Sequence, residues 1–280
     1  MSYETARLPT SGLANRILGV NEMKAEVKAK PASTVMLLRD GRSGLEVFMV
    51  VRHHQVDFAS GALVFPGGRI EESDAELAQS APRCPESPNL DVAARSLRVA
   101  AIRESFEECG ILLARPDGAA DLISGDRLRM IDRRAPFAEI LRRENLVLAI
   151  DLLVPFAHWI TPPFMPKRFD THFFVTPAPR DQIVVHDGRE TVDSIWISPQ
   201  MALEEGKRGR FTLVFATERN LWKLARFSDC ASAMAAAQAD PIVTVMPERI
   251  AAGQGYSLKI PSAAGYGGEL FPIRTPSLRE

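Results

Sequence analysis

Apolar residues along the chain fall into short runs that predict strands and longer periodic segments that predict helices. Turn residues between the first two short runs indicate a hairpin. The predicted strands cover residues 33–39, 45–52, 62–65, 111–114, 152–160, 171–176 and 190–197. The predicted order is strands first, then a helix, then more strands and further helices. This order predicts an α/β fold, with helices layered on a mixed sheet.

One predicted helix, in the first half of the chain, has a clear apolar face. Four apolar side chains recur on it at spacings of three, four and three, which is the helical period. These are Val99, Ile102, Phe106 and Cys109. Asn89 is the predicted N-cap, and Gly110 is predicted to end the helix because glycine adopts the left-handed conformation at little cost.

Further helices are predicted in the second half of the chain. Residues 125–144, 212–227 and 229–238 have helical patterns, and residues 241–274 show short strand-like runs. Ser198 followed by Pro199 predicts a helix start, since serine caps and proline fits the first position. Gly206 is the predicted end of that helix.

Acidic residues form a second stripe on the helix that ends at Gly110. Glu104, Glu107 and Glu108 lie at i, i+3 and i+4, so their carboxylates point into one small volume. Like charges this close repel unless a cation lies among them, and hard oxygen donors favour Mg²⁺, Mn²⁺ or Ca²⁺. Arg103 precedes Glu107 by one helical turn and is a candidate partner for it. The competing interpretation is a solvated acidic helix face.

Two adjacent glycines, Gly67 and Gly68, follow the third predicted strand. Glycines there allow a backbone to approach a ligand closely or to take a positive φ. A plain tight turn is the alternative. A strand, a glycine pair and an acidic helix together are a more specific signal than any one of them.

This stretch resembles the Nudix box, Gly-x5-Glu-x7-Arg-Glu-(apolar)-x-Glu-Glu-x-Gly-(apolar). Gly68 matches the opening glycine. The closing half is matched by Arg103, Glu104, Glu107, Glu108, Gly110 and Ile111. The chain departs from the pattern at Asp74, where the box has glutamate, at Ser105, where an apolar residue is usual, and in residues 75–102, which replace a gap of seven. We expect most of this insertion to form surface loop.

The resemblance implies a Nudix-type α/β/α sandwich and Mg²⁺ or Mn²⁺ as cofactor. It also implies that Glu107 and Glu108 bind metal, that Glu104 is a further ligand or the base, and that Arg103 orients the acids. Asp74 and Glu190 are candidates for a further acid. The candidates for substrate binding are Gly67, Gly68, Arg52, Arg69, Lys167 and Arg168.

The interrupted box resembles the acyl-CoA diphosphatase branch known from peroxisomes and its bacterial relatives. The expected reaction is hydrolysis of the diphosphate in a nucleoside diphosphate derivative, with CoA or acyl-CoA favoured. A nucleotide sugar, NADH or ADP-ribose is the alternative substrate. A Nudix-fold module that binds a nucleotide without hydrolysing it is the alternative from another class.

Composition limits the other classes. The 280 residues have a formal net charge of −1 and 46% hydrophobic residues, so we expect neither a nucleic-acid nor a membrane surface. Three cysteines without metal spacing indicate free thiols and a cytoplasmic protein. His53, His54 and His172 lack ligand spacing and are predicted to be structural. A homodimer is an expectation from the resemblance alone.

The predicted organisation is one Nudix domain with extensions. Residues 1–30 form a lead-in, and residues 31–240 form the domain, with an insertion at about 75–95. Residues 241–280 are expected to form an extension packed on the same domain.

Overall fold

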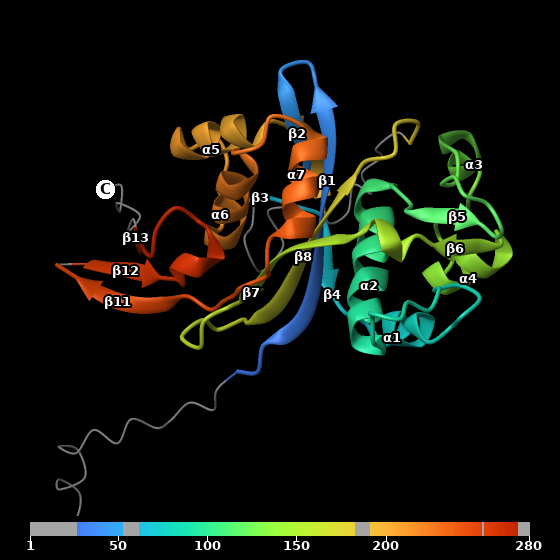
Figure 1. The fold of residues 1–280 in the computed structure, drawn as a ribbon, viewed down its shortest axis with the longest axis horizontal. Coiled ribbons are helices and arrows are strands. Elements are labelled where there is room, and N and C mark those ends of the chain that lie inside the picture. Colours follow the sequence, from blue (N-terminus) through green and yellow to red (C-terminus); the bar gives the residue numbers. More distant parts are fainter. Residues whose placement is uncertain (1–26, 53–61, 183–190, 254, 274–280) are drawn as a thin grey trace, which may run out of the picture.

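The fold is a mixed sheet with helices on both faces (Figure 1). The computed structural model describes residues 27–52, 62–182, 191–253 and 255–273. Its strands are β1 Lys30–Gly41, β2 Gly44–Arg52, β3 Leu63–Val64, β4 Gly67–Arg69, β5 Ala114–Pro116, β6 Leu146–Leu148, β7 Val154–Ile160, β8 Phe169–Pro177, β9 Thr191–Ile197, β10 Thr244–Val245, β11 Glu248–Ala252, β12 Gly255–Lys259 and β13 Leu270–Pro272. Its α-helices are α1 Glu72–Ala78, α2 Val92–Cys109, α3 Gly125–Arg129, α4 Phe137–Arg143, α5 Pro199–Lys207, α6 Phe215–Leu224 and α7 Cys230–Ala239.

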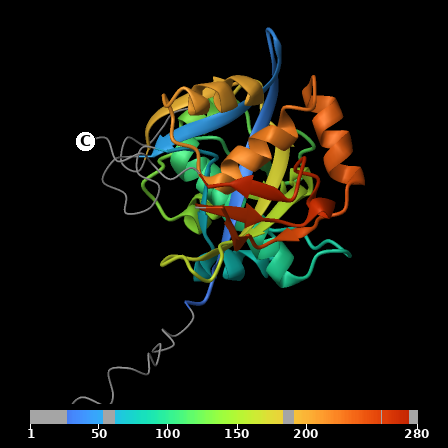
Figure 2. The ribbon, with the colours of Figure 1, turned by 90° about the vertical axis from the view of Figure 1, so that its left-hand side faces the viewer.

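Eight of the described strands form the main sheet. Its order is β10-β7-β8-β1-β2-β3, with β4 added to β1 and β9 added to β2. The β1–β8 and β10–β7 pairs are parallel and the other pairs are antiparallel, so the sheet is mixed as predicted. Figure 2 shows the smaller sheet β11-β12-β13 in front of the main sheet.

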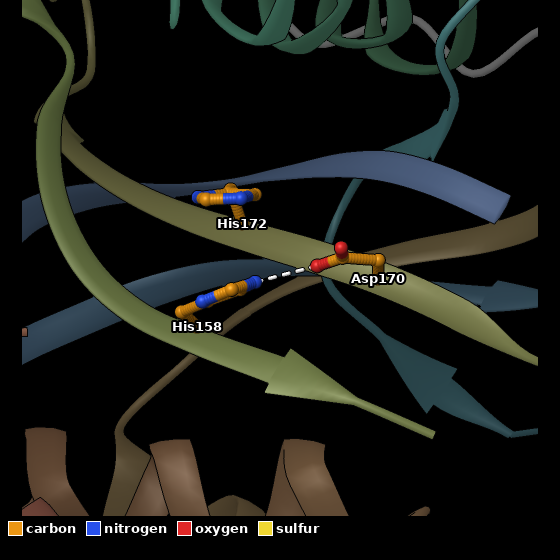
Figure 3. A group of neighbouring side chains, drawn as sticks. All are labelled: His158, Asp170 and His172. Atoms are coloured by element: carbon orange, nitrogen blue, oxygen red, sulfur yellow. Dashed lines mark hydrogen bonds and ion pairs between the residues drawn. The ribbon is translucent and has the colours of Figure 1, made fainter. Parts of the chain in front are cut away.

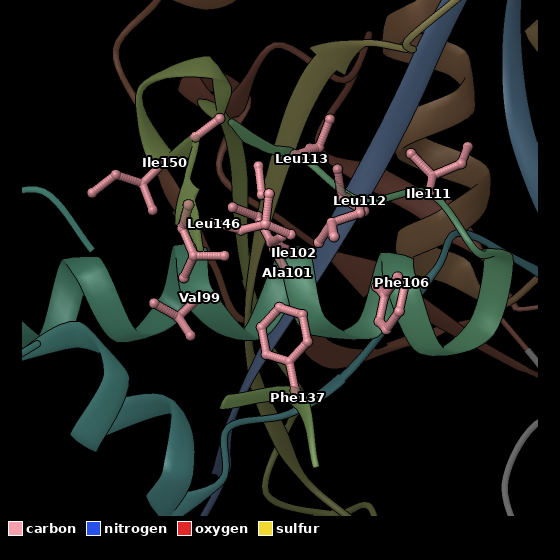
Figure 4. Close-up of a cluster of buried hydrophobic side chains, with 14 of the residues drawn as sticks. Val99, Ala101, Ile102, Phe106, Ile111, Leu112, Leu113, Phe137, Leu146 and Ile150 are labelled. Carbon is pink, nitrogen blue, oxygen red and sulfur yellow. The ribbon is translucent and has the colours of Figure 1, made fainter. Parts of the chain in front are cut away.

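The central strand β1 supplies side chains to two cores. Val35 and Leu37 pack in the cluster that includes Ile102 and Phe106 of α2 (Figure 4). Met36 and Leu38 point the other way, into the cluster with α6 and α7. Because successive strand residues face opposite sides, an unbroken apolar run is what a strand covered on both faces requires.

Helix α2 ends as predicted and begins elsewhere. Gly110 has a φ of 72° and its N–H donates to the carbonyl of Phe106, which closes the last turn. The N-cap is Asp91, whose side chain accepts a hydrogen bond from Ala94 N at 2.7 Å. The prediction of Asn89 as N-cap was wrong. The side chain of Asp91 accepts the hydrogen bond from a free N–H group in the first turn of the helix.

The insertion is less loop-like than predicted. It includes most of α1 and the first turns of α2, and Cys84 between them is fully buried. The single helix expected at residues 125–144 is two short helices, α3 and α4, with residues 130–136 between them. Pro136 is the N-cap of α4 and has no N–H to continue a preceding helix. The first strand after α2 begins only at Ala114. Helix α5 starts at the predicted Ser198 cap but runs through Gly206 to Lys207.

Candidate functional site

Arg103 is the centre of a buried network of acids. Its Nε and Nη2 atoms donate to the two carboxylate oxygens of Asp74, at 2.8 and 2.9 Å. Nη2 also donates to the carbonyl of Arg69 at 3.0 Å. Nη1 donates to Glu104 Oε1 at 2.9 Å and to Glu107 Oε2 at 3.0 Å. With only 5% of its side chain exposed, Arg103 is held by these bonds and orients two of the three box glutamates.

Asp74 connects the opening half of the interrupted box to Arg103 in the closing half. It lies 29 positions from Arg103 in sequence and is fully buried against it. Its Oδ2 atom also accepts the N–H of Glu71 at 2.8 Å, which caps α1. Both oxygens are therefore engaged inside the protein, and Asp74 positions Arg103 instead of facing a ligand. The pKa of Arg103 is raised, because burial, which lowers it, is outweighed by the bond to Asp74 and the nearby carboxylates.

The two glycines are in the short strand β4, not in a turn. Gly67 N donates to Glu108 Oε2 at 3.1 Å, so backbone directly holds one box acid. A Cβ atom on Gly68 would lie 2.3 Å from Glu104 Oε1, well inside contact distance. A side chain at position 68 would therefore displace the Glu104 carboxylate from its present place. The tight-turn alternative was wrong, and the approach of a ligand to this backbone stays a prediction.

The three box glutamates, Glu104, Glu107 and Glu108, are called the carboxylate cluster here. Glu104 and Glu107 both bind Arg103 Nη1, and Glu108 binds the backbone N–H of Gly67. The side chains of Glu104 and Glu107 are 13% and 49% exposed, and Glu108 is buried. Burial raises the pKa of Glu104 to about 7, and the charge of Arg103 offsets this only in part. Burial likewise raises the pKa of Glu107. These shifts mean that the negative charges are poorly solvated, and a divalent cation would relieve that cost.

The donor chemistry fits Mg²⁺ or Mn²⁺. The cluster offers carboxylate oxygens from one helix face, and the Cβ-free backbone at Gly68 leaves room for the carboxylate of Glu104. Hard oxygen donors are what these cations prefer. Arg103 neutralises part of the charge without leaving its bonds to Asp74.

No side chain of the other predicted substrate-binding residues is seen to bind this network among the described residues. Arg168 is buried and donates to the carbonyls of Thr161 and Val27, at 2.9 and 2.7 Å, so it fastens backbone. Lys167 is exposed beside it. Arg52 ends β2, but its side chain, like the whole of Glu190, is outside the described residues. Arg69 is exposed next to the box and lines a hollow with Lys30 and Glu71.

One contact to the box helix had no signal in the sequence. Arg133 Nη2 donates to the carbonyls of Phe106 and Glu107, at 2.6 and 3.0 Å, near the C-terminal end of α2. A cation there stabilises the last helical carbonyls. Arg133 sits in an arginine-rich segment, and nothing in the local pattern separates it from its neighbours.

Comparison with known proteins finds a family model that matches part of this chain. A family model described as the NUDT19 Nudix domain matches residues 86–214. This range holds Arg103 and the carboxylate cluster, and it starts after Gly68 and Asp74, consistent with the interruption. Over this range the chain is similar to the NUDT19 Nudix domain. The earlier resemblance is thereby confirmed, and the match supports a Nudix pyrophosphohydrolase as the class of enzyme.

Two curated relatives of this chain are acyl-coenzyme A diphosphatases named NUDT19. The Xenopus laevis protein is 26% identical over 215 residues, covering 60% of this chain and 57% of that protein. The Gallus gallus protein is 27% identical over 238 residues, covering 67% of this chain and 63% of that protein. The chain therefore spans about three fifths of the length of these relatives.

A solved structure supports the fold assignment. The Nudix hydrolase from Alicyclobacillus acidocaldarius matches with a TM-score of 0.65 and 27% identity, over 75% of this chain and 97% of that one. Among the residues described, no helix is both long and apolar enough to cross a membrane.

Proposed function

We propose that the chain is a divalent-metal-dependent hydrolase that cleaves the diphosphate bond of a nucleoside diphosphate derivative. The observation that carries the proposal is the carboxylate cluster, with Glu104 and Glu107 bound to the buried Arg103 and Glu108 bound to the backbone of Gly67. A solvated acidic helix face would have no need of a buried arginine and of a glycine that makes room for one carboxylate.

Each residue of the network has a proposed role. Glu107 and Glu108 hold Mg²⁺ or Mn²⁺, and Glu104 is a further ligand or the base. When bound, the cation would neutralise phosphate charge and lower the pKa of a bound water. As the base, Glu104 accepts a proton from the attacking water. The water oxygen bonds to one phosphorus, the bridging P–O bond breaks, and two phosphorylated products leave.

Within this class we favour CoA or acyl-CoA as substrate. The support is the NUDT19 model and the two NUDT19 relatives, whose names state an acyl-CoA diphosphatase activity. Hydrolysis would give 3′,5′-ADP and the phosphopantetheine part. Gly67 and Gly68 line the approach to the acids. Of the candidate cations, Arg69 is proposed as the phosphate contact because it is exposed beside the box, whereas Arg168 is already bound to backbone.

A substrate screen tests the proposal. Purified full-length protein is incubated with CoA, acyl-CoAs, NADH, ADP-ribose and nucleotide sugars, in Mg²⁺, in Mn²⁺ and in EDTA, and products are resolved by mass. We expect 3′,5′-ADP from CoA or acyl-CoA with metal and none in EDTA. Turnover of another compound would retain the hydrolase and reject the CoA assignment. Saturable nucleotide binding without product would favour the non-catalytic module.

A further inference from the structure

Three side chains outside the box meet on two neighbouring strands. His158 is on β7, and Asp170 and His172 are on β8 (Figure 3). The antiparallel register pairs His158 with His172, and Asp170 is two positions earlier on the same face of β8. The two rings stack with centroids 4.0 Å apart, and His158 Nε2 lies 2.5 Å from Asp170 Oδ1. We refer to these three residues as the histidine cluster.

The histidine cluster faces the same side of the sheet as α2. Phe174, two positions after His172, packs in the core formed with α2, and Arg98 of α2 lies over its ring at 4.9 Å. Period-two alternation places His172 and Asp170 on that side too. All three cluster residues are partly exposed, with 38% of the Asp170 side chain accessible, so solvent ions can reach them.

The cluster is close to the box but separate from it. In the sheet, His172 is the register partner of Ser33 on β1, and Ser33 is the partner of Gly68 on β4. Two strand spacings, about 10 Å in all, therefore separate the backbone of His172 from that of Gly68. None of the three residues belongs to the Nudix box.

The ligand set differs from that of the carboxylate cluster. Two imidazoles and one carboxylate offer ligand atoms that all lie within 4.8 Å of one another. Nitrogen and oxygen donors of this kind suit Zn²⁺ and other transition-metal ions better than Mg²⁺. His158 Nδ1 is 2.8 Å from Thr244 Oγ1 on β10. A hydrogen bond on one ring nitrogen orients the other nitrogen as a ligand.

The 2.5 Å contact between His158 and Asp170 must open slightly to admit an ion, since ligands about 2.0–2.1 Å from one tetrahedral ion lie farther apart than this. A change of side-chain torsion on the partly exposed Asp170 provides that opening.

We propose that His158, Asp170 and His172 bind a transition-metal ion of the Zn²⁺ class, at a site distinct from the carboxylate cluster. The three protein ligands leave a fourth position for water or another small ligand. The proposal rests on the register of β7 and β8 and not on the proposed hydrolase activity.

The test is a calorimetric Zn²⁺ titration of the untagged full chain in excess Mg²⁺. Cys230, which is not fully buried, is changed to serine in every protein to remove a competing thiol. We expect about one equivalent of Zn²⁺ to bind, and the visible spectrum of bound Co²⁺ to report nitrogen ligands. His158→Gln and His172→Gln should each weaken Zn²⁺ at least tenfold, whereas the Glu107→Gln/Glu108→Gln double variant should bind it unchanged.

Two outcomes would overturn the site. One is equal Zn²⁺ affinity in the parent and in His172→Gln, with circular dichroism showing both folded. The other is loss of Zn²⁺ only in the glutamate double variant, which would place the ion at the box. Thr244→Val is a second variant that keeps all three ligands, and we expect it to weaken Zn²⁺ by less than either histidine change. Failure here leaves the hydrolase proposal intact, because that proposal depends on Mg²⁺ or Mn²⁺ turnover.

Discussion

At the scale of single residues, the acids on α2 carry the proposed chemistry of the protein. Changing Glu107 or Glu108 to glutamine removes a charged oxygen donor with almost no change in shape. We expect turnover to fall roughly 100-fold or more, because a lost ligand weakens the cation that stabilises phosphate charge. Steady-state rates with the substrate found in the screen measure this. Glu76→Gln, an exposed acid on α1, is the matched control and should retain full activity.

The raised pKa of Glu104 predicts how stability depends on pH without metal. The carboxyl is protonated up to about pH 7 in the folded protein but only to about 4.5 when unfolded. The folded state therefore binds the extra proton, and Glu104 makes the protein less stable as pH rises through this window. The slope is at most about 1.4 kcal/mol per pH unit.

Thermal unfolding in EDTA between pH 4.5 and pH 7.5 measures this effect. Glu104→Gln should show a shallower fall in Tm than the parent. Added Mg²⁺ should also reduce the fall, since it binds the ionised acids. Parallel curves for the parent and Glu104→Gln would show that Glu104 titrates in its ordinary range.

Gly68 provides a second test at this scale. A Cβ atom there would lie 2.3 Å from Glu104 Oε1, so Gly68→Ala must push the carboxylate aside. We expect at least about a tenfold loss in turnover, because a small displacement of a metal-site acid is costly. Gly255→Ala is the control, since its Cβ would meet only a carbonyl at 3.9 Å. A fully active Gly68→Ala enzyme would mean that Glu104 tolerates displacement.

At the scale of elements, the start of α2 can be tested directly. Asp91→Ala removes the side chain that accepts the Ala94 N–H, and a lost N-cap costs about 0.5–2 kcal/mol. Asn89→Ala removes no capping bond and should change stability by less than about 0.5 kcal/mol. Urea unfolding of both variants gives the comparison. Equal losses would place the helix start nearer to Asn89.

How far the sequence predicted these elements depended on whether the signal was local. Gly110 and Ser198 act on their own helix ends, and both were predicted correctly. Residues 125–144 were predicted as one helix because the apolar pattern continues past the break before Pro136. The two candidate caps of α2 are both good capping residues, and only the fold decides between them.

The candidate site shows the same division. The acids on α2 share one helix face, and their spacing alone predicted that Glu104 and Glu107 lie together; both bind Arg103 Nη1. The contact between Asp74 and Arg103 spans 29 positions and an insertion, so no local pattern indicated it. The histidine cluster depends on the register of two strands, which the sequence does not specify, and His172 was accordingly predicted to be only structural.

At the scale of the whole molecule, the C-terminal residues complete the second core. Tyr266 is buried, donates to Asn220 Oδ1 at 2.8 Å and accepts from Trp159 Nε1 at 3.0 Å. Burial raises its pKa well above the ordinary value. The hydroxyl of Tyr266 thus connects the segment between β12 and β13 to α6 through Asn220 and to the main sheet through Trp159 on β7.

Tyr266→Phe should therefore destabilise the protein as a whole. It leaves two buried polar groups without their partner, at a cost of about 1–3 kcal/mol. Tyr256→Phe, at a residue 48% exposed on β12, is the control and should change stability by less than about 0.5 kcal/mol. Chemical unfolding measures both variants. An unchanged free energy of unfolding for Tyr266→Phe would show that this hydroxyl does not contribute to stability.

The ion pair between Asp74 and Arg103 also bears on how such proteins are found. A text pattern with a fixed gap between the opening and closing halves of the box would pass over this chain. In this chain a carboxylate and a guanidinium meet in space although 29 positions separate them. A search built on that contact, with the length of the gap left open, would find this chain.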